Sequence, residues 1–320
     1  MKTKTKTSLK EIAQATGFSL STVSRALTGE HSISTDTRRQ VRSAAEQMGY
    51  AMKRRNVIII PPSLWYSPYY TQMISGISMG LSHYGFSSIV LPFMNISELD
   101  SVDFFGAVSL MNGDEVGKLW NMGRKKPLIS VNSISNLPHV YPRVSSNDQF
   151  GMGLLVNYLV KKGHKRIARI GGPYTLDKEN WSAVQRNRIY DDLADRNGLE
   201  KSMLYGPECE LKSIMELLNN CLERNVTALL VLAEDYMLPI LYAVRMMRIK
   251  VPEELTIVGW YYEFLCQYLE RNFYGITHDY MTIGQKTAEL MDRLFNGEKP
   301  TEDIFVDYHV SDSKCLSMNS

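Results

Sequence analysis

Apolar residues recur with two different periods along the chain, and these periods divide it into a short head and a longer body. In the first fifty residues the apolar positions lie three or four apart, which is the spacing of amphipathic helices. From residue 57 onward, short runs rich in β-branched residues alternate with helical patterns. Such alternation is typical of parallel sheets with helices on both faces, so the pattern predicts a small all-α unit followed by an α/β body.

The head pattern predicts three short helices. Ser8 and Glu11 have the spacing of a capping box, so a first helix should begin there and end at Gly17. Hydroxyls that can cap further helices stand at Ser19 and Ser34. Two short helices joined by a glycine-containing turn and braced by a third can place a recognition helix in the major groove of DNA. The spacing alone fits a plain three-helix bundle equally well.

The body pattern predicts two lobes. Its strand-like runs cover residues 57–60, 88–91, 106–110, 128–131, 167–170, 228–232 and 256–258. About 260 residues of this alternation exceed what one sheet comfortably holds, so we expect two α/β lobes with ligands at the carboxyl ends of the strands.

Charge is distributed unevenly between head and body. Residues 1–56 contain eleven Lys and Arg against four Asp and Glu, whereas the remainder carries a net charge of −5. A basic unit before a mildly acidic body favours a nucleic-acid-binding head on a regulatory or catalytic domain.

The composition also indicates where the protein is located and which cofactors it lacks. The longest apolar runs are far shorter than the roughly 20 residues of a membrane helix, and the N-terminus lacks the apolar segment of a secretion signal. We therefore expect a cytoplasmic protein without membrane contact. Four widely spaced cysteines predict neither a disulfide framework nor a zinc site, and we expect no metal and no cofactor.

The amino-acid sequence of the head also resembles that of a known family. The segment LKEIAQATGFSLSTVSRALTGEHSISTDTRRQVRSAAEQMGY, residues 9–50, resembles the DNA-binding domain of the lactose-repressor (LacI/GalR) family of bacterial transcription regulators nearly position by position. The run at 21–27 followed by Gly29 is its most specific part. The resemblance implies that Leu20 and Ser21 select bases and that Arg25 reaches a base edge. It also implies phosphate or groove contacts at Thr22, Ser24 and His31.

The resemblance extends through the body. Residues 147–173 are similar to the family's crossover between lobes, and residues 248–260 to its late strand. It implies an all-α helix-turn-helix DNA-binding head followed by a two-lobed α/β periplasmic-binding-protein-like effector domain. The expected boundaries are 1–50 for the head, 51–56 for a linker and 57–320 for the effector domain, with a first lobe of about 57–163 and 281–300 and a second lobe of about 164–278 and 301–320.

The linker departs from the family pattern. Family members normally carry a longer stretch here, which folds into a hinge helix and kinks the operator centre. Six residues make under two turns of helix, so a standard hinge helix is excluded. The basic linker residues are expected to track phosphates, or else to be a solvated connection. The complete predicted DNA-binding set is Ser19, Leu20, Ser21, Thr22, Ser24, Arg25, Thr28, His31, Lys53, Arg54 and Arg55.

The expected effector site also rests on the resemblance. It places an effector-contacting arginine at Arg186, and it sets Tyr261 and Glu234 where sugar-binding members carry carboxylate and amide groups. Nearby aromatic residues could stack on a sugar face or a planar ligand, or they could be ordinary core residues. We expect a small-molecule, carbohydrate-type effector. The complete predicted effector-binding set is Tyr69, Tyr70, Asn147, Asp148, Trp181, Arg186, Glu234, Asp235, Trp260 and Tyr261.

The sequence contains one string known from catalytic sites. Gly76, Ser78 and Gly80 spell G-x-S-x-G, the string of the hydrolase nucleophile elbow. That elbow requires a strand running directly into the serine, whereas residues 69–84 have the pattern of one helix. The sequence therefore predicts no catalytic residue and no enzyme.

The combined interpretation is a sequence-specific DNA-binding transcription regulator, specifically a repressor, controlled by an effector bound between two lobes. We expect a homodimer on a near-palindromic double-stranded operator. Two alternatives remain: a ligand-binding or scaffold protein with a vestigial DNA-binding head, and an enzyme built on the same fold.

Overall fold

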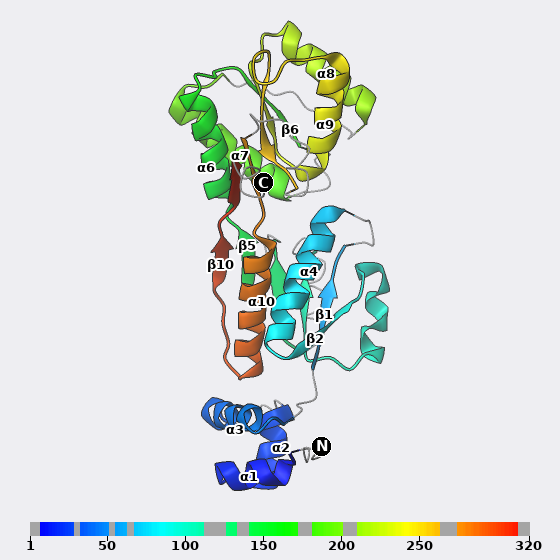
Figure 1. The fold of residues 1–320 in the computed structure, drawn as a ribbon, viewed down its shortest axis with the longest axis vertical. Coiled ribbons are helices and arrows are strands. Elements are labelled where there is room, and N and C mark those ends of the chain that lie inside the picture. The colour runs from blue at the N-terminus through cyan, green and yellow to red at the C-terminus, as the bar shows by residue number, and fades with distance from the viewer. Residues whose placement is uncertain are drawn as a thin grey trace, which may run out of the picture. The chain divides into compact units, whose positions relative to one another are not determined.

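The computed structural model describes residues 7–28, 33–50, 55–62, 67–111, 126–132, 141–171, 181–200, 210–262 and 274–312. The chain forms two compact units, whose elements are drawn in Figure 1. The first unit combines Met1–Trp65, Gln72–Ser145 and Tyr280–Ile304, and the second combines Tyr66–Thr71, Ser146–Asp279 and Phe305–Ser320. Within the described residues, no helix is both long enough and apolar enough to cross a membrane.

The head contains the three helices that its pattern predicts: α1 (Leu9–Thr16), α2 (Leu20–Thr28) and α3 (Thr35–Gln47). Ser8 and Glu11 form the capping box of α1, and Gly17 ends that helix in the left-handed conformation at φ 74°. Ser34 caps α3. The head has a core of its own, made by the buried residues Ile12, Val23, Ala26, Val41 and Ala45.

The rest of the first unit is built on a six-stranded sheet with the order β10-β5-β4-β3-β1-β2. The pairs from β2 through β1, β3 and β4 to β5 are parallel. Its elements are β1 (Arg55–Ile60), β2 (Phe86–Val90), β3 (Gly106–Ser109), β4 (Leu128–Val131), β5 (Arg143–Ser146), β10 (Asp303–Val306), the 3₁₀ helix η1 (Phe93–Ser101), α4 (Pro68–His83) and α10 (Tyr280–Phe295).

Helices α4 and α10 lie side by side with their backbones in contact (Figure 1). A methyl group on Gly76 would overlap the carbonyl oxygen of Tyr280, and one on Gly80 would overlap that of Gly284. The G-x-S-x-G string therefore lies inside a helix, as its pattern predicts, and its glycines permit close helix packing. Ser78 accepts a hydrogen bond from the Ser88 hydroxyl at 2.9 Å.

The second unit contains a five-stranded sheet with the order β11-β9-β8-β7-β6, in which β11 is antiparallel to β9 and the other pairs are parallel. One core cluster lies between this sheet and α8 and α9, and another lies between the sheet and α6 and α7. The elements are β6 (Ile167–Ile170), β7 (Ala228–Val231), β8 (Thr256–Trp260), β9 (Tyr274–Thr277), β11 (His309–Asp312), α6 (Asp148–Lys161), α7 (Trp181–Asn197), α8 (Leu211–Glu223) and α9 (Glu234–Met247).

The structure differs from the sequence expectation at the first lobe crossover. We predicted a first lobe extending to about residue 163, but the second unit begins at Ser146. The reason is that Met152, Leu155, Val156 and Leu159 of α6 are buried in the core cluster of the second unit. Helix α6 therefore belongs to the second unit.

The structure also shortens the linker and adds strands. Arg55 and Asn56, which we assigned to the linker, already pair with β2 as the start of β1.

Strands β5, β9, β10 and β11 were not predicted. They are four residues each, and β10 is largely half-exposed or exposed, so its apolar pattern is weak.

Candidate DNA interface and effector site

Helix α2 separates a buried side from an exposed side. Val23 and Ala26 are buried in the core of the head. On the other side Leu20 is 51% exposed, and Ser21 and Arg25 are also exposed. We call Leu20, Ser21 and Arg25 the recognition face, because they are the residues that the resemblance assigns to base contacts.

The start of α2 is fixed by Ser19. The backbone amide of Thr22 donates to the Ser19 hydroxyl at 3.1 Å. The same hydroxyl lies 2.9 Å from that of Ser21 and 2.8 Å from that of Thr22. Ser19 therefore acts as the N-cap of α2 and also belongs to a polar group beside the recognition face.

The remaining predicted DNA-binding residues lie in different settings. Thr22 and Ser24 are half-buried on α2, and Thr28 is exposed at its end. Arg55 lies in β1, where its guanidinium is 5.0 Å from the ring centroid of Phe295 and burial lowers the pKa of that guanidinium. The structure thus brings the α2 residues together but holds Arg55 apart from them. His31, Lys53 and Arg54 lie outside the described residues.

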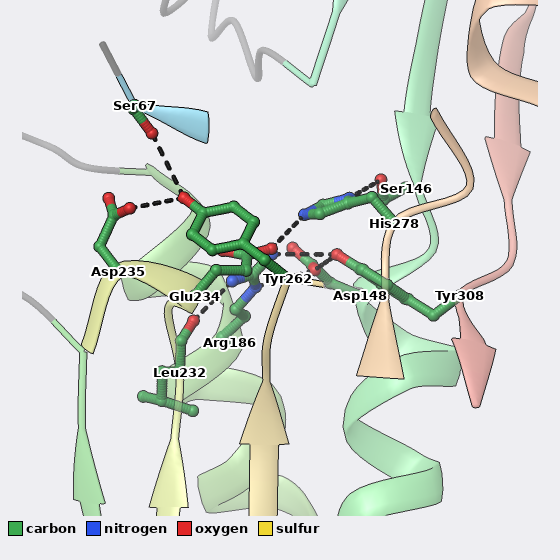
Figure 2. Close-up of polar contacts among 10 residues, drawn as sticks. All are labelled: Ser67, Ser146, Asp148, Arg186, Leu232, Glu234, Asp235, Tyr262, His278 and Tyr308. Carbon is green, nitrogen blue, oxygen red and sulfur yellow. Dashed lines mark hydrogen bonds and ion pairs between the residues drawn. The ribbon is translucent and has the colours of Figure 1, made fainter. Parts of the chain in front are cut away.

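A second group of polar side chains lies in the second unit, at the carboxyl edge of the parallel strands (Figure 2). Glu234 and Asp235 follow β7, Tyr262 follows β8 and His278 follows β9. Neighbouring parallel strands end at the same edge, so residues far apart in sequence meet there. The polar cluster is defined here as Ser67, Ser146, Asp148, Arg186, Glu234, Asp235, Tyr262, His278 and Tyr308.

Glu234 and His278 lie in close, buried contact. The Glu234 Oε1 and His278 Nε2 atoms are 2.8 Å apart, and the two side chains are 9% and 3% exposed. The other ring nitrogen of His278, Nδ1, lies 2.6 Å from the Ser146 hydroxyl. Burial raises the pKa of the Glu234 carboxyl, but His278 and Arg186 outweigh burial and leave that pKa below its ordinary value. Glu234 is therefore an ionised, compensated carboxylate.

Arg186 organises a second buried network. Its guanidinium donates to Asp148 at 3.0 Å, to the carbonyl oxygen of Leu232 at 2.5 Å and to the Tyr308 hydroxyl at 2.9 Å. Tyr308 in turn donates to Asp148 at 2.5 Å. Burial lowers the pKa of Arg186, but Asp148, Tyr308 and Glu234 outweigh it and leave the pKa above its ordinary value. Arg186 is therefore a permanent, fully engaged cation.

A third part of the polar cluster surrounds Asp235. The Tyr262 hydroxyl donates to this carboxylate at 2.5 Å and lies 3.3 Å from the Ser67 hydroxyl. Burial, followed by the hydrogen bond to Asp235, raises the pKa of Tyr262. Burial and the same carboxylate also raise the pKa of Tyr70. Tyr69 contacts the ring of Tyr70 edge-on, with the centroids 5.0 Å apart.

Some predicted effector residues have structural roles in the second unit. Trp260 and Tyr261 are fully buried in core clusters. Asn147 caps α6 by accepting from the amide of Phe150 at 3.1 Å, and it donates to Asp307 at 2.8 Å. Trp181 begins α7, and its side chain lies outside the described residues.

Sequence reasoning missed five members of the polar cluster: Ser67, Ser146, Tyr262, His278 and Tyr308. His278 and Tyr308 adjoin β9 and β11, two strands that the pattern did not predict. Tyr262 is the residue after the predicted Tyr261, so recognising the end of β8 would have suggested it. In the part of the chain that the structure describes, no group of three or more His, Cys, Asp and Glu side chains is arranged to hold a metal ion.

Two family models match the chain in the order of its parts. The model for bacterial regulatory proteins of the lacI family matches residues 8–52, and the model for a periplasmic binding protein-like domain matches residues 156–311. The chain therefore carries a LacI-family DNA-binding domain followed by a periplasmic binding protein-like domain.

Curated relatives agree with this assignment along almost the whole length. The HTH-type transcriptional repressor CytR of Escherichia coli is 25% identical over 317 residues, covering 91% of this chain and 90% of CytR. The HTH-type transcriptional regulator CelR of Thermobifida fusca is 23% identical over 330 residues, covering 93% and 94%. These relatives confirm the prediction of a DNA-binding transcription regulator rather than an enzyme.

Solved structures show the same fold. The Lac repressor bound to ONPG in its repressed state superposes with a TM-score of 0.70 at 18% identity, covering 96% of this chain and 99% of the other. A CelR–cellobiose complex superposes with a TM-score of 0.67 at 22% identity, covering 96% and 98%. The predicted fold class, a helix-turn-helix head on a two-lobed α/β domain, is confirmed.

Proposed function

We propose that this regulator is a cytoplasmic repressor that binds a near-palindromic operator through α2 and responds to a carbohydrate-type effector at the polar cluster. The observation that carries the proposal is that α2 has one buried side and one exposed side. Its apolar side is committed to the core of the head, whereas Leu20, Ser21 and Arg25 are exposed. Exposed side chains on the second helix of this motif are positioned for the major groove.

The recognition face has chemistry that can discriminate bases. A guanidinium such as that of Arg25 can donate two hydrogen bonds to the O6 and N7 atoms of guanine, and Leu20 can contact a thymine methyl group. The excess of basic residues in the head supplies attraction to phosphates without sequence information. Specific and non-specific binding therefore depend on different residues.

The polar cluster has chemistry suited to a polyhydroxylated ligand. Carboxylates, a guanidinium and hydroxyls offer both acceptors and donors, and Tyr69 and Tyr70 offer rings close to His278 and Asp235. The solved CelR relative is a complex with cellobiose, which supports the carbohydrate class. We propose Tyr69, Tyr70, Asp148, Arg186, Glu234 and Asp235 as effector-binding residues, supported by Tyr262 and His278. Trp260 supports the site, because the Arg186 guanidinium lies 4.0 Å from its ring centroid.

A homodimer is supported by an exposed apolar stripe on α9. Leu238, Tyr242 and Met246 are spaced four residues apart and are 55%, 55% and 52% exposed. Residues four apart share one face of a helix, and a contiguous exposed apolar face favours association. One structural neighbour is a Lac repressor dimer bound to operator. A dimer requires two half-sites separated by about one helical turn, or a multiple of it.

The proposal is tested by selecting duplexes from a random pool with the full-length protein at near-physiological salt, with and without a saccharide panel. We expect enrichment of a near-palindromic sequence, and at least one saccharide that changes its retention. Leu238→Lys should reduce the palindrome to a single half-site, whereas Lys212→Ala on the exposed side of α8 should not. Failure to enrich any sequence under all conditions would contradict the regulator function and favour a ligand-binding scaffold.

The effector part has a separate test. Tyr262→Phe removes the hydroxyl that donates to Asp235 but keeps the ring. We expect it to weaken binding of the active saccharide in calorimetry by about tenfold or more, because Asp235 loses the hydroxyl that orients its carboxylate. Tyr158→Phe, a matched change outside the polar cluster, should leave the affinity unchanged. Equal affinities for both variants would contradict the proposed site.

A further inference from the structure

Helix α3 of the head makes a buried contact with the last turn of α10. Arg38 of α3 is only 1% exposed. Its Nη1 donates to the carbonyl oxygen of Phe295, the last residue of α10, and its Nη2 donates to the carbonyl oxygen of Ile33 at 3.2 Å. A guanidinium this deeply buried requires partners, and these carbonyl groups come from both sides of the contact.

A second arginine strengthens the same contact. Arg42 lies one turn further along α3 and donates to the Asp292 carboxylate at 2.9 Å. The two side chains are 16% and 23% exposed, so water screens this pair only partly. The Arg42 guanidinium also lies 4.5 Å from the ring centroid of Phe295. Arg55 approaches the same ring from β1, with its guanidinium 5.0 Å from the centroid.

Elementary electrostatics explains why cations gather here. The last carbonyl groups of a helix have no partner within the helix, and the C-terminal end carries a partial negative charge. Phe295 ends α10 and presents an aromatic face, which attracts cations. The end of α10 therefore combines a free carbonyl oxygen, a carboxylate and a π face, and α3 presents two guanidinium groups to them.

We propose that this contact docks the DNA-binding head onto α10 and does the orienting work that a hinge helix would otherwise do. The linker is too short for a standard hinge helix, and Arg55 at its end is already in β1. Docking through α3 leaves the recognition face of α2 exposed. The docked head is therefore competent to bind DNA, and docking removes the orientational freedom that a free head would lose on binding.

The first test substitutes residues of α10 and none of the head. Asp292→Arg places a cation opposite Arg42, and Glu289→Arg makes the same charge change one turn earlier on α10, where its carboxylate pairs with Lys286. Hydrogen exchange of the full-length protein is followed by mass spectrometry in the peptide covering α3. We expect exchange there to rise at least fivefold in Asp292→Arg and to be unchanged in Glu289→Arg.

Operator affinity is the second readout, and it rests on the proposed function, whereas hydrogen exchange does not. We expect Asp292→Arg to weaken operator binding at least fivefold relative to Glu289→Arg, with equal affinity of the two variants for scrambled duplex.

The double variant Arg42→Asp with Asp292→Arg should restore protection of α3. Should Asp292→Arg fail to fold, Asp292→Ala replaces it. Unchanged exchange would overturn docking, and unchanged or tighter operator binding would overturn its orienting role. A wild-type protein that selects no operator would instead refute the proposed function.

Discussion

The recognition face and the polar cluster use polar residues in opposite ways. On α2, Leu20, Ser21 and Arg25 are exposed, and the core of the head is made by other residues. In the polar cluster, Arg186, Glu234 and His278 are buried; Arg186 pairs with Asp148, and Glu234 lies against His278. The comparison teaches that exposed polar residues can be changed without cost to stability, whereas residues of a buried polar network cannot.

The largest expected effect comes from breaking a buried charge network. Arg186→Ala leaves Asp148 without its cation, and removing one partner of a buried pair typically costs about 3–5 kcal/mol. We expect this loss of unfolding free energy in urea titrations. Arg188→Ala, an exposed position on the same helix, should change stability by less than about 0.5 kcal/mol. If Arg186→Ala were as stable as the wild type, the polar cluster would contribute no more to stability than the recognition face does.

The matching change on the recognition face should affect function alone. Arg25→Ala should weaken operator binding by about 1–3 kcal/mol, because a bidentate base contact is lost. Affinity for scrambled duplex should fall much less, and the urea midpoint should stay within error of the wild type. Arg39→Ala, which removes an exposed arginine from α3, provides the control for charge. Equal losses on both duplexes would show that Arg25 contacts phosphates only.

Ser19 sharpens the comparison because it is a predicted DNA-binding residue and also caps α2. Ser19→Ala should destabilise the head by about 1 kcal/mol through loss of the α2 cap. Ser19→Asp keeps an acceptor for the Thr22 amide and should retain stability while reducing DNA affinity through its charge. Thermal unfolding and duplex titration separate the two effects. Equal stability of Ser19→Ala and the wild type would show that the cap contributes nothing.

The smallest expected effect is a pH dependence from Glu234. Its pKa is lowered in the folded protein, so its contribution to stability is present above its unfolded value near 4.5 and is lost as the pH falls through the lower folded value. The stability difference between the wild type and Glu234→Gln should therefore shrink as the pH falls below about 4.5. Urea titrations across this range measure it. A difference that grows on acidification would contradict the assignment.

Much of the fold was predictable because its signals are local. The capping box at Ser8 and Glu11, the αL glycine at residue 17 and the Ser34 cap each act within one helical turn. The strands 128–131 and 167–170 match their predicted bounds, because three of the four residues in each are apolar and every residue is buried. The weak patterns of β9 and β11 concealed His278 and Tyr308.

By itself, the sequence determined the helices of the head, the alternation of strands and helices in the body, and the exposed side of α2, since each depends on residues within a few positions of one another. Only the tertiary structure decided that α6 joins the second unit, that Glu234 meets His278, and that Arg38 and Arg42 meet the end of α10. These pairs are 44 to more than 250 residues apart. Their partners are chosen by the order of strands in a sheet and by the satisfaction of buried charges, which no local pattern encodes.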